Sequence, residues 1–134
     1  AGTGATTYLC SSYAWDTAVN FIMNNGMTNY ATSRDNFNEN WIDRQVVDST
    51  GKEIKAKDTA KRLPTGKTTA KSNLFDMGGN VTEFTTEINP GTDESLVSRS
   101  GDYNGYKNPA GCRFDVSARY SSNNYGFRVT LFLK

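Results

Sequence analysis

One strong helical period near the N-terminus constrains the fold of this chain more than any other feature. Its apolar residues recur at the spacing of a single helix face: Trp15, Ala18, Val19 and Ile22. The hydroxyl of Ser11 or Ser12 can cap the first turn, and Gly26 can end the helix because glycine tolerates a left-handed stop. A second, weaker helical pattern covers residues 35–43. Helices therefore account for little of the chain, and short strands and loops must form the rest.

Short strands are the other regular elements that the sequence predicts, at residues 44–48, 81–88, 95–100 and 127–133. Polar turns are predicted at residues 48–52 and 89–91. Residues 52–71 are charged and rich in Thr with little periodicity, which favours a surface excursion. A helix followed by short strands and long polar loops indicates an α+β fold. The length of 134 residues suits a single domain, 1–134.

Composition excludes several classes of protein. The chain has no histidine, which excludes a Ser-His-Asp or Cys-His nucleophile pair and histidine metal ligation. Its 15 basic and 14 acidic residues give a net charge of +1, which disfavours a dedicated nucleic-acid binder. No apolar run approaches the ~20 residues that cross a bilayer. Cys10 and Cys112 can pair or remain separate, and we favour unpaired structural thiols.

The most specific run in the chain spans residues 73–84 and reads N-L-F-D-M-G-G-N-V-T-E-F. In it, Asp76 and Glu83 flank a turn that contains two glycines. Hard cations such as calcium bind carboxylate and backbone carbonyl oxygens, and a tight glycine turn exposes such carbonyls. The alternative is a capped turn whose carboxylates accept hydrogen bonds from backbone amides. These residues alone leave that choice open.

This run resembles the N-x-x-D-M-x-G-N-V-x-E-W signature of the formylglycine-generating enzyme and sulfatase-modifying-factor family, with Phe84 in place of tryptophan. Residues 99–103 (R-S-G-D-Y) resemble the R-G-G-S-W segment of that family, and residues 124–129 (N-Y-G-F-R-V) resemble its closing N-x-G-F-R motif. Residues 15–18 (W-D-T-A) are weakly similar to its W-E-x-A helix. The matches cover the C-terminal half well and the N-terminal half loosely. The resemblance implies a C-type-lectin-like fold of the formylglycine-generating-enzyme subtype.

The resemblance also implies a metal site in the signature run. A calcium site of some family members corresponds to four positions here: Asp76, Gly79, Val81 and Glu83. We therefore expect a possible structural calcium ion, and no cofactor for catalysis.

The resemblance offers two catalytic precedents, and the chain lacks the metal ligands of both. The formylglycine-generating oxidases hold copper with two nearby cysteines close to the G-F-R motif, whereas here only Cys112 lies in that region. If Ala118 and Arg119 are aligned with the family's Ala-Arg, Gly111 falls at the reactive position. The related sulfoxide synthases bind non-haem iron through histidines, and this chain has none. We therefore predict no catalytic residues and no enzyme activity, with an oxidase as the least favoured alternative.

A different branch of the same fold fits better, namely the variable proteins of diversity-generating retroelements. Their hypervariable region lies at the C-terminus and closes with G-F-R and a short strand, which corresponds here to residues 99–128. This region is rich in Tyr, Arg, Ser and Asn, which suit adaptable contact surfaces. These retroelements randomise adenines, chiefly in asparagine-type codons, which cannot become Lys, Glu, Gln, Met or Trp. None of those five residue types occurs in residues 108–133.

We therefore predict a non-catalytic, receptor-type or adhesin-type domain that binds a protein or glycan, with an invariant lectin-like adhesin module as the alternative. The sugar-binding triplets of animal C-type lectins are absent. Nucleic acid is not an expected partner, and a cell surface, secretion or a phage virion is the expected location. Pro109, Ala110, Gly111 and Gly126 are predicted to set the loop path. The predicted contact residues, expected to project from loops onto one face, are Asp102, Tyr103, Asn104, Tyr106, Arg113, Phe114, Asp115, Ser117, Arg119, Tyr120, Asn123 and Asn124.

Overall fold

The computed structural model describes residues 4–34, 39–91, 94–105 and 107–133 of the chain. Its elements follow one another as β1 (Ala5–Leu9), α1 (Ser12–Asn24), β2 (Val46–Val47), β3 (Glu53–Lys55), β4 (Thr82–Ile88), β5 (Ser95–Arg99), β6 (Arg113–Ser117), β7 (Tyr125–Phe127) and β8 (Val129–Leu133). The helix near the N-terminus and the short strands confirm the predicted α+β class.

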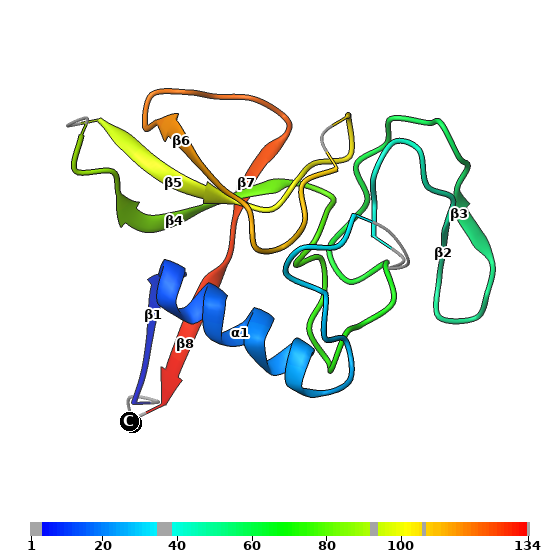
Figure 1. Ribbon diagram of the computed structural model, residues 1–134, viewed down its shortest axis with the longest axis horizontal. Coiled ribbons are helices and arrows are strands. Elements are labelled where there is room, and N and C mark those ends of the chain that lie inside the picture. Colours follow the sequence, from blue (N-terminus) through cyan, green and yellow to red (C-terminus); the bar gives the residue numbers. More distant parts are fainter. Residues whose placement is uncertain (1–3, 35–38, 92–93, 106, 134) are drawn as a thin grey trace.

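A four-stranded sheet carries the C-terminal half of the fold, with the spatial order β6-β5-β4-β7. β4 pairs with β5 and β5 with β6 in antiparallel fashion, whereas β4 and β7 are parallel. The first and last strands form a separate antiparallel ribbon, in which Leu9 pairs with Val129. In Figure 1 this ribbon and α1 lie below the sheet, and the β2–β3 hairpin lies at the far right.

The helix forms as its sequence predicts. Ser11 is the N-cap, and its side-chain oxygen accepts a hydrogen bond from the backbone N–H of Ala14 at 3.1 Å. The helix ends at Asn24, and Gly26 follows with a φ of +103°, a conformation that favours glycine. Trp15, Val19 and Ile22 are its buried apolar residues, as the spacing predicts.

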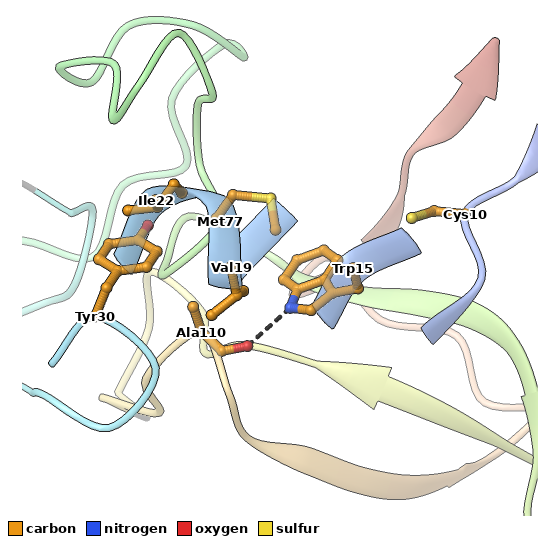
Figure 2. Packing of buried hydrophobic residues seen from close by; sticks show 7 residues of the cluster. All are labelled: Cys10, Trp15, Val19, Ile22, Tyr30, Met77 and Ala110. Atoms are coloured by element: carbon orange, nitrogen blue, oxygen red, sulfur yellow. Dashed lines mark hydrogen bonds between the residues drawn. The ribbon is translucent and has the colours of Figure 1, made fainter. Parts of the chain in front are cut away.

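The apolar core lies where this helix face meets residues from distant parts of the chain: Cys10, Tyr30, Met77 and Ala110 (Figure 2). The indole N–H of Trp15 donates a hydrogen bond to the backbone carbonyl of Ala110 at 2.8 Å. The helix is thereby tied directly to the segment that leads into β6. The core therefore positions the segment that enters β6 within the predicted contact region.

The second predicted helix, at residues 35–43, is not present in its described part. Residues 39–43 have no helical assignment, and residues 35–38 lie outside the described part of the chain. The carbonyl of Asn40 accepts a hydrogen bond from the backbone N–H of Asn80 at 3.1 Å, so it is engaged outside its own segment. The side chain of Asn40 donates to Asn80 Oδ1 at 2.8 Å. These contacts with the signature run replace a local helix.

Residues 52–71 are largely exposed, but they contain a strand and a buried cation that the prediction of a surface excursion missed. β3 lies within them, and Lys55 at its end is buried. The ammonium group of Lys55 donates hydrogen bonds to the carbonyls of Trp41 at 2.9 Å and Thr59 at 3.1 Å. Burial lowers the pKa of this ammonium group. The strand predicted at 127–133 is also divided, because β7 ends at Phe127 and β8 begins at Val129.

Candidate ligand-binding surface

The edge strand β6 carries four of the predicted contact residues, which corrects the expectation that all of them lie on loops. Arg113, Phe114, Asp115 and Ser117 belong to this strand. Its register places Phe114 opposite Ser98 of β5, which is itself opposite Phe84 of β4. The sequence held a signal for the strand, since Phe114 and Val116 alternate with polar neighbours at the period of two.

A hollow of about 330 Å³ lies at this part of the sheet. It brings together five predicted contact residues: Asp102, Phe114, Asp115, Tyr120 and Asn124. Four further lining residues were not predicted, namely Thr82, Asn108, Val116 and Tyr125. Thr82 and Tyr125 pair across β4 and β7, so the sheet itself forms part of the wall. We call these nine residues the β6–β7 hollow.

Aromatic rings form much of the wall of the β6–β7 hollow. Tyr125 stacks on Phe84 with ring centroids 5.1 Å apart, and the ring of Tyr120 meets Tyr125 edge-on at 5.3 Å. Phe114 is 40% exposed and Tyr120 is 52% exposed. Such half-exposed rings keep apolar area available for a ligand, and the contact with Tyr125 limits the motion of the Tyr120 ring.

Asp102 is the buried polar residue of the hollow, with only 5% of its surface exposed. Its Oδ1 accepts a hydrogen bond from the backbone N–H of Asn104 at 2.7 Å. Its Oδ2 accepts a longer hydrogen bond from the Asn124 side chain at 3.4 Å. Asp102 therefore connects the loop after β5 with the loop before β7.

The remaining predicted contact residues that the structure describes do not line the hollow. Arg113 forms ion pairs with Asp16 of α1 and Glu87 of β4, and with them lines a separate hollow. Arg119 is exposed and pairs with Glu94 at 2.5 Å. Arg113 therefore lies at a different hollow from its neighbour Phe114. Of the others, Ser117, Asn104 and Asn123 are exposed and Tyr103 is half-buried, whereas Tyr106 lies outside the described residues.

The carboxylates of the predicted calcium ligands Asp76 and Glu83 already have protein partners, as does the carbonyl of Gly79. Asp76 Oδ1 accepts a hydrogen bond from the hydroxyl of Thr68 at 2.8 Å, and its Oδ2 accepts one from the N–H of Gly66 at 3.0 Å. The carboxylate of Glu83 is bound by the guanidinium of Arg128. The carbonyl of Gly79 accepts from the N–H of Val81 at 3.0 Å.

Arg128 also donates hydrogen bonds to backbone carbonyl oxygens of the turn. Its Nη2 lies 3.3 Å from the carbonyl oxygens of both Phe75 and Asp76, and its guanidinium lies 5.1 Å from the Trp15 ring centroid. Burial disfavours its charged form, but the hydrogen bonds and charge of Glu83 outweigh this effect and raise the pKa of Arg128. In the described part of the chain, no group of three Cys, Asp or Glu residues could hold a metal ion. A calcium ion would meet the positive charge of Arg128, so these residues do not fit it.

The two cysteines are free, as favoured from the sequence. Cys10 is buried in the core and Cys112 is half-buried just before β6. Burial raises the pKa of both thiols above the ordinary value. Because the thiolate is the reactive form, burial lowers the nucleophilicity of both groups at neutral pH. Within the described residues, no helix has the length and apolar character to cross a membrane.

The arrangement of one helix, a four-stranded mixed sheet and a ribbon joining the first and last strands is the C-type-lectin-like fold, in the subtype of the formylglycine-generating enzymes. The crystal structure of CarF superposes with a TM-score of 0.67 at 16% sequence identity, over 93% of this chain and 46% of CarF. Variable protein 1 of Treponema denticola superposes with a TM-score of 0.59 at 17% identity, over 92% of this chain and 46% of that protein. This chain thus spans about half the length of each.

These likenesses confirm the predicted fold, including its likeness to a variable protein. No protein-family model matches the sequence, and no curated protein matches it either. At 16% and 17% identity, the shared feature is the fold, and function has to be argued from the surface.

Proposed function

We propose that the chain is a variable ligand-binding domain of the diversity-generating-retroelement type. It binds a protein or glycan through the β6–β7 hollow and the loops around it, and performs no chemistry on the ligand. One observation carries the proposal: five predicted contact residues from the C-terminal region meet at a half-exposed aromatic hollow. The likeness in fold to a variable protein supports it. A cell surface, a secreted protein or a phage virion is the setting we propose for such a binder.

The separation between the buried scaffold and the exposed edge of the sheet supports this function. In β5, Ser98 and Arg99 are fully buried, and Arg99 donates to the carbonyl of Cys112 at 3.1 Å. In the neighbouring β6, Arg113, Phe114 and Asp115 are exposed. β6 pairs with β5 through backbone hydrogen bonds, and its exposed side chains face solvent instead of the core. Sequence can therefore change at the edge while the scaffold holds its shape.

The chemistry of the chain favours binding over catalysis. Histidine is absent, and burial raises the pKa of both thiols. The carboxylates of Asp76 and Glu83 are held by donors of the scaffold itself. The hollow instead offers rings, amides, hydroxyls and two acidic residues, which give contact area and adaptable polar contacts.

Two matched libraries test the proposal. In the first, Asp115, Tyr120 and Asn123 of the exposed surface are randomised together. In the second, the buried scaffold residues Thr85 and Ser98 are randomised. We expect most members of the first library to unfold cooperatively near the parental Tm and to yield binders to unrelated proteins. Most members of the second library should fail to fold. Equal loss of folding in both libraries would overturn the proposal.

A further inference from the structure

The charged residues that line the β6–β7 hollow are all acidic. Two acidic residues, Asp102 and Asp115, are among the residues that line it, and none of its nine described lining residues is Lys or Arg. Asp102 is almost fully buried and accepts its hydrogen bonds from neutral donors, the N–H of Asn104 and the amide of Asn124. The negative charge at the hollow therefore lacks a cation among its own lining residues.

Three basic residues lie close in sequence to residues that line the hollow, and each forms an ion pair with an acidic residue outside it. Arg113 pairs with Asp16 and Glu87 in another hollow. Likewise, Arg119 pairs with Glu94, and Lys107 pairs with Asp43. Among the described residues, these three basic groups are thus engaged away from Asp102 and Asp115, which leaves the hollow suited to a cation from a ligand.

The aromatic walls suit the same kind of ligand. A cation is attracted to the face of a Tyr or Phe ring, and a planar guanidinium also stacks on such a ring. Phe114, Tyr120 and Tyr125 supply three rings to the hollow. Its volume of about 330 Å³ lies at the small end of the range for ligand sites, and suits one side chain better than an extended glycan.

We propose that the β6–β7 hollow binds a basic side chain of a protein partner, with arginine preferred. The proposal rests on the proposed function, because it names the chemistry of the ligand at that same surface. In the complex, Asp102 and Asp115 provide the charge, and the rings of Phe114 and Tyr120 cover the guanidinium.

The test uses Nα-acetyl-arginine amide as the probe and Nα-acetyl-citrulline amide as its uncharged isostere. Binding of each probe is measured from the changes in amide chemical shift of the isotopically labelled protein. We expect saturable shifts at residues of the hollow with the arginine probe, and binding of citrulline weaker by about fivefold or more. The Asp115→Asn variant should lose most of this preference. The Asp58→Asn variant removes an exposed carboxylate outside the hollow and should keep it.

Three results would overturn the proposal: equal affinity for the two probes, no saturable shift at the hollow, or an undiminished arginine preference in Asp115→Asn. Failure of the probe test leaves the library test of the proposed function unaffected. Conversely, arginine binding by a chain whose surface library does not fold would identify a fixed basic-ligand site. The two proposals can therefore fail separately.

Discussion

The guanidinium of Arg128 donates hydrogen bonds to both carboxylate oxygens of Glu83, with Nε 2.5 Å from Oε2 and Nη2 2.7 Å from Oε1. Glu83 belongs to the signature run and Arg128 to the closing G-F-R motif, so the two segments that revealed the fold in the sequence meet here. The same guanidinium lies over the ring of Trp15. Arg128, which lies between β7 and β8, thus connects these two strands with β4 through Glu83 and with α1 through Trp15.

Breaking this pair should destabilise the fold strongly. In Arg128→Gln, the carboxylate of Glu83 stays buried without its cation, and we expect the free energy of unfolding to fall by about 3 kcal/mol. Arg119→Gln is the matched control, because its ion pair with Glu94 is exposed and should contribute no more than about 1 kcal/mol. Urea unfolding measures both. Similar losses in the two variants would contradict the role assigned to Arg128.

Calcium should leave the stability unchanged. Thr68 and Gly66 already satisfy the Asp76 carboxylate, and Arg128 already satisfies that of Glu83. We expect the same Tm in millimolar calcium and in excess chelator. The account is wrong on this point if calcium raises the Tm and the rise disappears in Asp76→Ala.

Gly111 should not tolerate a side chain. A Cβ at this position would lie 2.5 Å from the backbone oxygen of Ala31, which also accepts a hydrogen bond from the N–H of Gly111 at 3.0 Å. We expect Gly111→Ala to destabilise the protein by about 1–3 kcal/mol. Gly105→Ala lies in the same region with no atom within 4 Å of its Cβ and should be nearly neutral. Thermal unfolding that ranks the two variants the other way would refute the packing described here.

Glu39 should make stability fall with rising pH. Its side chain is buried, and its Oε1 accepts a hydrogen bond from the hydroxyl of Tyr30 at 2.6 Å. Burial raises the pKa of Glu39 in the folded state, so the folded chain retains its proton at a pH where the unfolded chain has lost it. Stability from this group is complete below the unfolded pKa of about 4.3 and is lost as pH rises through the folded pKa.

The Glu39→Gln variant checks this dependence, since it keeps the shape of the side chain and removes the titration. The Tm of the wild type relative to this variant should fall between about pH 4 and the folded-state pKa. A difference in Tm that is constant over this range, or that moves the other way, would show that Glu39 is ionised in the fold.

Local patterns in the sequence predicted the elements that form by local rules. The helix at Trp15, its Ser11 cap and the strands around Glu83 follow from periodicity and capping. Likewise, the turn at residues 48–52 follows from Asp48, whose Oδ1 accepts hydrogen bonds from the N–H groups of Thr50 and Lys52.

Elements that depend on distant partners were not predicted. β1 forms because β8 lies beside it, and the described part of residues 35–43 is held by Asn80 instead of by a helix. The candidate site shows the same limit. Composition indicated Phe114 and Tyr120, whereas Thr82 joins them only because β4 and β7 pair in the fold.

The coding sequence around residues 99–128 tests the central claim most directly. If the chain is the variable domain of a diversity-generating retroelement, its genome holds a near-copy of this coding segment beside a reverse transcriptase gene. The two copies should differ mainly where the second copy has adenine, and the differing codons should include those of exposed residues such as Asp115 and Tyr120. A genome with no such copy, or with differences spread evenly over all four bases, would contradict the account.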